Sequence, residues 1–138
     1  MEYRVKYSEH DGVKERVYFS FEPPFKMLSA FLDDEVSNFF EPMLADFNLV
    51  LSGKRRRYES SGNAFFWIIG PKTTKIVCMF PCSERVDEPV VVGTEELVQL
   101  MKEWNAARKE FAEKGSVGVG LFPRAGSRKC RFHRFKYR

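Results

Sequence analysis

Three cysteines and one histidine form two closely spaced pairs, Cys78 with Cys82 and Cys130 with His133. Zn²⁺ takes four cysteine or histidine ligands in a tetrahedron, and structural zinc sites are commonly built from two such pairs. The spacing therefore makes a Cys3His zinc site one hypothesis. Two features count against it, because C-x3-C is less typical than C-x2-C, and residues three apart in a strand point to opposite faces. The competing interpretation has no cofactor, with two core thiols and a peripheral Cys–His pair.

Basic residues gather in two segments with the chemistry of a nucleic-acid-binding surface. Lys54–Arg57 is a run of four cations, and residues 124–138 carry seven cations, no acid and three interleaved rings. Cations bind phosphates through counterion release, and rings stack on exposed bases. No RNP1 sequence, GXXG clamp or zinc-finger spacing accompanies them, so nucleic acid binding is an alternative function. The residues that would contact nucleic acid are Lys54, Arg55, Arg56, Arg57, Arg128, Lys129, Arg131, Arg134, Lys136 and Arg138.

The rest of the chain is mildly acidic. Without the seven C-terminal cations, 16 basic residues stand against 19 acidic ones, a net charge of −3. Acids in one predicted helical region could form a surface complementary to a basic protein, which would accelerate association and fix its register. The competing interpretation is an ordinary solvated helix face. The acids of this predicted protein-binding face are Asp33, Asp34, Glu35, Glu41 and Asp46.

No catalytic motif is present. The chain lacks GxSxG, a glycine-rich phosphate loop and HExxH, and it has only two histidines. Ser52-Gly53-Lys54 lacks the preceding glycine that a phosphate loop requires. The sequence therefore favours a protein that is not an enzyme, although active sites also assemble without a local signature.

Aromatic residues make up 15% of the chain, which is unusually high. Rings on strands around a long helix could line an apolar pocket for a small molecule, which is a further alternative function. The plainer expectation is that the same rings fill a solid core. The rings concerned are Phe65, Phe66, Trp67, Phe80 and Trp104.

The first part of the chain predicts a β-hairpin followed by helix. Residues 2–8 and 13–22 alternate apolar and polar positions around Asp11-Gly12, which is a strong hairpin turn signal. From Phe25 to Phe47 the apolar period changes to that of a helix, and Pro42 should kink or interrupt it. Asp33 or Asp34 is positioned to cap a second helical piece.

The second part predicts more strands and one long helix. Phe65–Ile69 and Lys75–Phe80 are apolar runs of strand length, and their continuous apolar character predicts central strands covered on both faces, or at least with one face against helices. Residues 94–114 keep the helical period from Thr94, a favourable N-cap, to Gly115 at the C-terminal end. Residues 124–138 alternate like a terminal edge strand.

Together these elements predict an α+β fold in one domain, residues 1–138, with a single antiparallel sheet of about five to seven strands and two main helices. No run of ~18 to 20 apolar residues that could cross a bilayer is present, and the amino end lacks the apolar stretch of a signal peptide. A cytoplasmic location with no membrane partner is therefore expected. The preferred function is a non-catalytic protein that binds another protein, as an inhibitor or adaptor.

Overall fold

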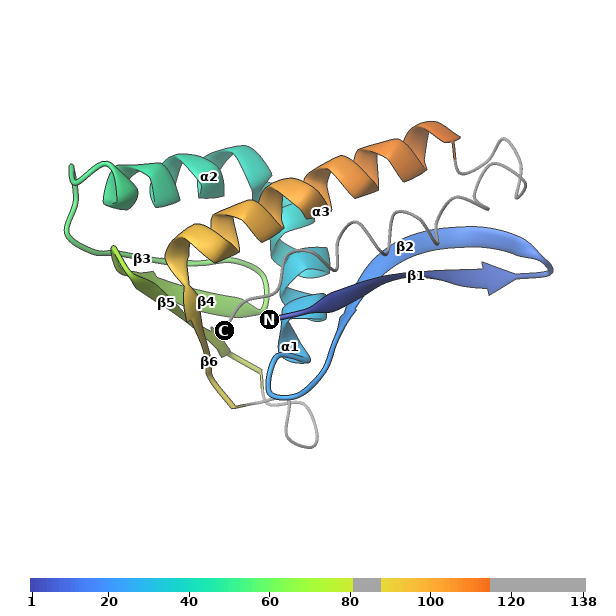
Figure 1. Ribbon diagram of the computed structural model, residues 1–138, viewed down its shortest axis with the longest axis horizontal. Helices are drawn as coiled ribbons and strands as arrows, with labels where there is room; N and C mark the ends of the chain where they lie inside the picture. Colours follow the sequence, from blue (N-terminus) through green and yellow to red (C-terminus); the bar gives the residue numbers. More distant parts are fainter. Residues whose placement is uncertain (81–87, 115–138) are drawn as a thin grey trace.

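The computed structural model describes residues 1–80 and 88–114. Figure 1 shows a hairpin at one end, a larger sheet at the other, a short helical column between them and longer helices across the top. The strands are β1 (Tyr3–His10), β2 (Val13–Phe21), β3 (Tyr58–Ser61), β4 (Phe65–Ile69), β5 (Thr73–Cys78) and β6 (Val90–Gly93). The helices are α1 (Met27–Phe31), the π-helical turn η1 (Leu32–Val36), α2 (Ser37–Leu51) and α3 (Thr94–Lys114).

The prediction of a single sheet is wrong. Among the residues that the structure describes, β1 and β2 pair only with each other, and the other strands form a separate antiparallel sheet in the order β3-β4-β5-β6. The hairpin buries the side chains of Tyr3, Val5, Val17, Phe19 and Phe21. The apolar positions of its alternating pattern therefore pack into the core, although the hairpin does not pair with the other sheet. Alternation indicates that a strand has a buried face but does not say which strand lies beside it.

The hairpin itself is confirmed. The central turn residues Asp11 and Gly12 have φ angles of 54° and 78°, as a type I′ turn requires. Tyr3 pairs with Phe21 and Tyr7 with Val17, and the register shifts once, between Ser8 and Glu9.

The helical region bends where the sequence places proline. Phe39 inside α2 has a non-helical backbone, with φ −132° and ψ 31°. Pro42 lacks the amide hydrogen that would bond to the carbonyl of Asn38, and its ring crowds that carbonyl. This explains the break at Phe39, the residue after Asn38. Neither Asp33 nor Asp34 caps a second helix, because the chain continues through η1 without leaving helical geometry.

One hydrophobic cluster contains side chains from both sheets and from the helices. The Phe31 ring of the central column contacts the Trp67 ring of β4 edge-on, with centroids 5.4 Å apart. On α3, the Trp104 ring contacts Phe19 of the hairpin at 5.1 Å, and its Nε1–H donates to Ser37 Oγ at 3.0 Å. The helices therefore join two sheets that share no backbone hydrogen bonds.

The long helix is confirmed as Thr94–Lys114. Its first residue is tied to the β4–β5 turn, since the Thr94 hydroxyl donates to the carbonyl of Gly70 at 2.6 Å and lies 2.8 Å from the Thr74 hydroxyl. Within residues 1–80 and 88–114, none of the helices combines the length and the hydropathy that a membrane span needs.

Candidate binding surfaces

Glu35, predicted to lie on an acidic face, is fully buried. Its carboxylate accepts hydrogen bonds from three successive backbone amides of the β3–β4 turn, those of Asn63 at 2.9 Å, Ala64 at 2.7 Å and Phe65 at 2.9 Å. We call this arrangement the Glu35 clamp. It joins the central column to the sheet, so the Glu35 side chain is not accessible to a protein partner.

The neighbouring acids Asp33 and Asp34 lie at the surface. The Asp33 carboxylate pairs with the Arg16 guanidinium of β2 at 3.5 Å. Partial burial raises the pKa of Asp34 above its ordinary value of 3.8, the carboxylates of Asp33 and Glu35 raise it further, and Arg16 opposes them. Asp34 is therefore the member of this group whose negative charge the fold disfavours.

This raised pKa predicts a pH-dependent effect. Replacing Asp34 with asparagine should stabilise the protein at neutral pH, where the carboxylate is ionised, by at most about 0.5 kcal/mol at this exposed position. The gain should disappear as the pH falls through the raised pKa, because the wild-type side chain is then protonated and uncharged as well. Thermal unfolding at pH 7 and near pH ~3 measures it. A D34N variant less stable than wild type at neutral pH would contradict the prediction.

The two remaining acids of the predicted face lie on α2. Glu41 is exposed, whereas Asp46 is half-buried. Burial raises the pKa of Asp46, while a hydrogen bond from Tyr58 and the nearby Arg55 lower it. Three of the five predicted acids thus have partners within the chain, Glu35 in the buried clamp, Asp33 in an ion pair with the hairpin and Asp46 beside Tyr58 and Arg55, whereas Asp34 and Glu41 are exposed. Their role in protein binding stays a prediction for the exposed members.

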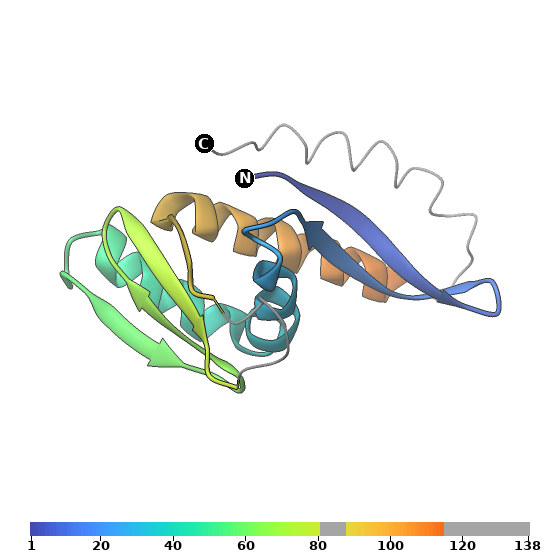
Figure 2. The ribbon, with the colours of Figure 1, turned by 90° about the horizontal axis from the view of Figure 1, so that it is seen from below.

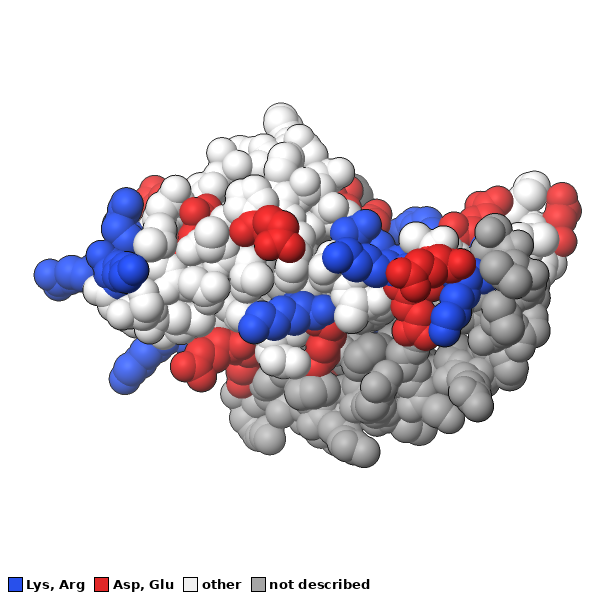
Figure 3. Space-filling model, turned by 90° about the horizontal axis from the view of Figure 1, so that it is seen from above, with Lys and Arg blue, Asp and Glu red and all other residues white. Residues whose placement is uncertain are grey.

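The basic loop, Lys54–Arg57, lies exposed between α2 and β3, at the left end of the molecule in Figures 1 and 3. The Arg55 guanidinium lies 4.9 Å from the centre of the Tyr58 ring, and Arg57 pairs with Glu59 at 2.7 Å. The other predicted nucleic-acid contacts, at Arg128, Lys129, Arg131, Arg134, Lys136 and Arg138, lie outside the described residues. Nucleic acid binding by the two segments together stays a prediction.

The predicted zinc site also lies mostly outside the described residues, which contain Cys78 but not Cys82, Cys130 or His133. The Cys78 thiol is half-buried at the end of β5 and donates to the carbonyl of Phe80 at 3.1 Å. Among the residues the structure describes, no three His, Cys, Asp or Glu side chains cluster as metal ligands would.

The rings predicted to line a pocket are divided as well. Phe65, Trp67 and Trp104 are buried in the core, whereas Phe66 is half-buried on the opposite side of the sheet and Phe80 is 63% exposed. The three buried rings therefore fill the core, as the plainer expectation had it.

The four-stranded sheet has a second face that the sequence did not single out. In Figure 2 the sheet lies in front of α2. Phe65, Trp67 and Ile69 of β4 are buried, and the first two contact the Phe31 ring of the central column, so this side of the strand faces the helices. The intervening residues point the other way, onto what we call the outer face. Cross-strand pairing arranges this face in two adjoining rows, Ser61-Phe66-Val77 and Glu59-Ile68-Lys75-Val91.

The outer face is apolar along most of its length. Phe66, Ile68 and Val77 are half-buried and Val91 is 55% exposed. Met79, which is 37% exposed, follows Val77 by two residues, so strand alternation places it on the same face. The alternation continues this far because the Met79 amide still donates to the carbonyl of Ala64, the residue before β4. The signal in the sequence was FFWII in β4, in which all five positions are apolar although the described helices cover only one face.

No protein-family model matches this chain, and neither a curated protein nor a solved structure matches it.

Proposed function

We propose that this chain is a non-catalytic protein that binds another protein, and that the outer face of the four-stranded sheet is its docking surface. One observation carries the proposal. Two of the four large apolar side chains exposed among the described residues, Met79 and Val91, lie on this face, one after the end of β5 and one on β6. Of the other two, Phe80 follows Met79 and Val13 lies at the hairpin tip.

Physical arguments favour a docking surface on the outer face over a surface that binds nothing. Single exposed apolar residues are ordinary, but a contiguous apolar patch on a soluble protein marks an interaction surface. Phe66 and Val77 are cross-strand neighbours, and Ile68 and Val91 flank Lys75 in the adjoining row, so the apolar atoms form one surface. A rigid antiparallel sheet also presents them with little loss of backbone entropy on binding.

Site-specific crosslinking in the native host tests the proposal. A photo-crosslinking residue at Val91 of the full chain should give a discrete protein adduct, and the same residue at Ala45, exposed on α2, should not. Changing Ile68 and Val77 to threonine keeps their branched shape but removes apolar contact, so it should reduce the adduct at least ~10-fold. Circular dichroism and thermal unfolding of each variant establish that it is folded.

Two results would contradict the proposal. One is equal labelling from Val91 and Ala45. The other is an adduct at Val91 whose yield the threonine substitutions leave unchanged in a folded protein.

A further inference from the structure

We infer that the partner docking on the outer face is an acidic protein, with a carboxylate that meets Lys75 inside an apolar contact and further acids facing the basic loop. This inference rests on the proposed function and adds the chemistry of the partner. It assigns the opposite polarity to that expected from the sequence, which indicated an acidic surface on this chain and a basic partner.

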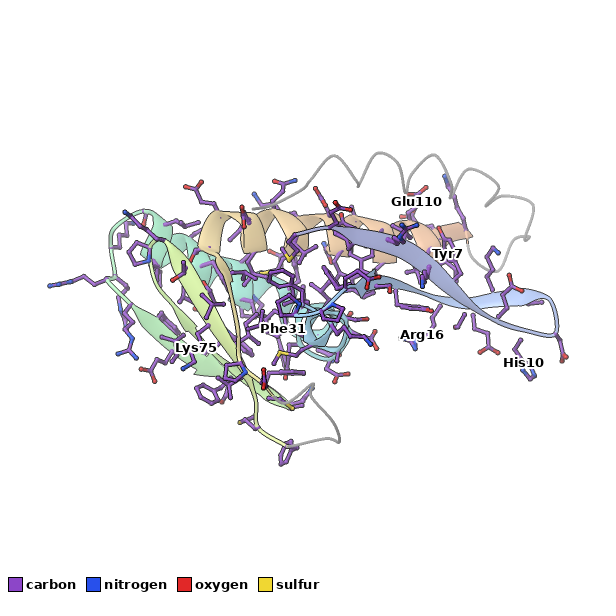
Figure 4. The ribbon with its side chains drawn as sticks, turned by 60° about the horizontal axis from the view of Figure 1, so that its bottom comes forward. Tyr7, His10, Arg16, Phe31, Lys75 and Glu110 are labelled. Atoms are coloured by element: carbon purple, nitrogen blue, oxygen red, sulfur yellow. The ribbon has the colours of Figure 1, made fainter. Side chains whose placement is uncertain are left out.

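Lys75 is the central observation. It lies in the middle of the outer face, directly between Ile68 on β4 and Val91 on β6. Figure 4 shows it on the sheet strands, and the strand alternation directs it away from the helices. A partner that covers the two aliphatic neighbours must also remove water from the ammonium group between them.

No acid among residues 1–80 and 88–114 forms an ion pair with Lys75. Glu59 lies in the same row but two strands away, roughly 10 Å at ordinary strand spacing, and it is already paired with Arg57. A charge that is buried without a counter-charge weakens binding strongly. A carboxylate on the partner removes that penalty, which is why the partner is expected to be acidic at this point.

The cations bordering one end of the outer face extend the same argument. Tyr58 pairs with Ile69, so the basic loop that precedes Tyr58 meets the β4–β5 turn that follows Ile69 and carries Lys72. Lys72, Lys54 and Arg56 are exposed there. The described acids near this end are Glu59, paired as above, Asp46 beside Tyr58, and Glu95 and Glu96, which begin α3 next to Lys72 because the Thr94 amide donates to the Lys72 carbonyl. The five cations, Lys54–Arg57 and Lys72, outnumber these four acids, and a field of this sign attracts acidic partners and speeds their association.

The side chains in the middle of the outer face favour a protein partner over a nucleic acid partner. Single-stranded nucleic acids are held by rings that stack on bases. The outer face presents one ring, Phe66, and otherwise the aliphatic side chains of Ile68, Val77 and Val91. Aliphatic groups complement apolar protein surface but supply no stacking platform.

The test uses the Val91 crosslink in the full chain, with three charge variants. Changing Lys75 to glutamate should reduce the adduct at least ~10-fold through repulsion, and changing it to methionine should reduce it less, because the partner's carboxylate then loses its counter-charge without meeting a like charge. Changing Lys102, exposed on α3, to glutamate is the matched control and should leave the yield unchanged. The yield from the wild-type surface should also fall as salt rises from ~0.05 M to ~0.5 M.

The outcomes separate this inference from the proposed function. An adduct that K75E leaves unchanged or strengthens would overturn the acidic partner while leaving protein binding in place. An adduct that disappears on nuclease digestion would overturn it in favour of a nucleic acid. The absence of any adduct from the wild-type surface would remove the proposed function, and the inference with it.

Discussion

Replacing Glu35 with alanine should lower the free energy of unfolding by about 3 kcal/mol or more. Three backbone amides of the β3–β4 turn donate to this one carboxylate. Each buried donor left without an acceptor costs about 1 to 3 kcal/mol, although water admitted to the space recovers part of that cost. Burial of Glu35 is complete, so its removal also leaves a cavity between the central column and the sheet.

Denaturant unfolding of matched variants measures this effect. Asp34→Ala is the control, since its exposed neighbouring side chain forms no part of the clamp, and it should change stability by about 0.5 kcal/mol or less. Glu35→Gln keeps the size and one acceptor oxygen but turns an amide donor toward the backbone N–H groups, so it should fall between the two. An E35A protein as stable as D34A would show that the clamp contributes nothing.

Replacing Gly62 with alanine is the second large effect expected, a loss of about 2 kcal/mol. A Cβ atom at this position would lie 2.0 Å from Oε1 of Glu35 and 2.6 Å from its Cδ. The carboxylate cannot move aside freely, because three amides hold it in place. Inserting one carbon into a packed site of this kind typically costs about 1 to 3 kcal/mol.

The double variant distinguishes this cause from a general intolerance of the turn. If the clash is with Glu35, removing that side chain makes room for the new methyl group, so E35A and G62A together should cost less than the sum of the two single losses. A coupling of about 1 kcal/mol or more is expected for groups in direct contact. Strict additivity would show that Gly62 is required for another reason.

The clamp also determines which substitutions can test an acidic binding face. Charge reversal at Glu35 would disrupt the fold, so a loss of binding in that variant would not report on a surface. Asp34 and Glu41 are exposed and suitable for such a test. Because burial already disfavours the charge of Asp34, reversal at Glu41 gives the more direct readout.

Local patterns in the chain predicted several elements correctly. The Asp11-Gly12 turn, the bend near Pro42 and the helix from Thr94 follow from backbone preferences that act within a few residues. The candidate site was not predicted in the same way. The acids of residues 33–35 are consecutive, and helical geometry alone separates their directions by about 100° per residue, so one of them enters the core while its neighbours stay in water.

The amino-acid sequence by itself determined the α+β class, the hairpin and the long helix from Thr94, because each depends on local periodicity and turn chemistry. Only the tertiary structure decided that the strands form two sheets, that Glu35 is an internal clamp and that the described helices leave one face of β4 uncovered. Those outcomes depend on which surfaces meet, and the meeting residues lie far apart in the chain, as Glu35 and Phe65 do. The sequence of an apolar strand does not indicate whether helices cover both of its faces or only one. The exposed face could therefore be identified only from the packing of the elements.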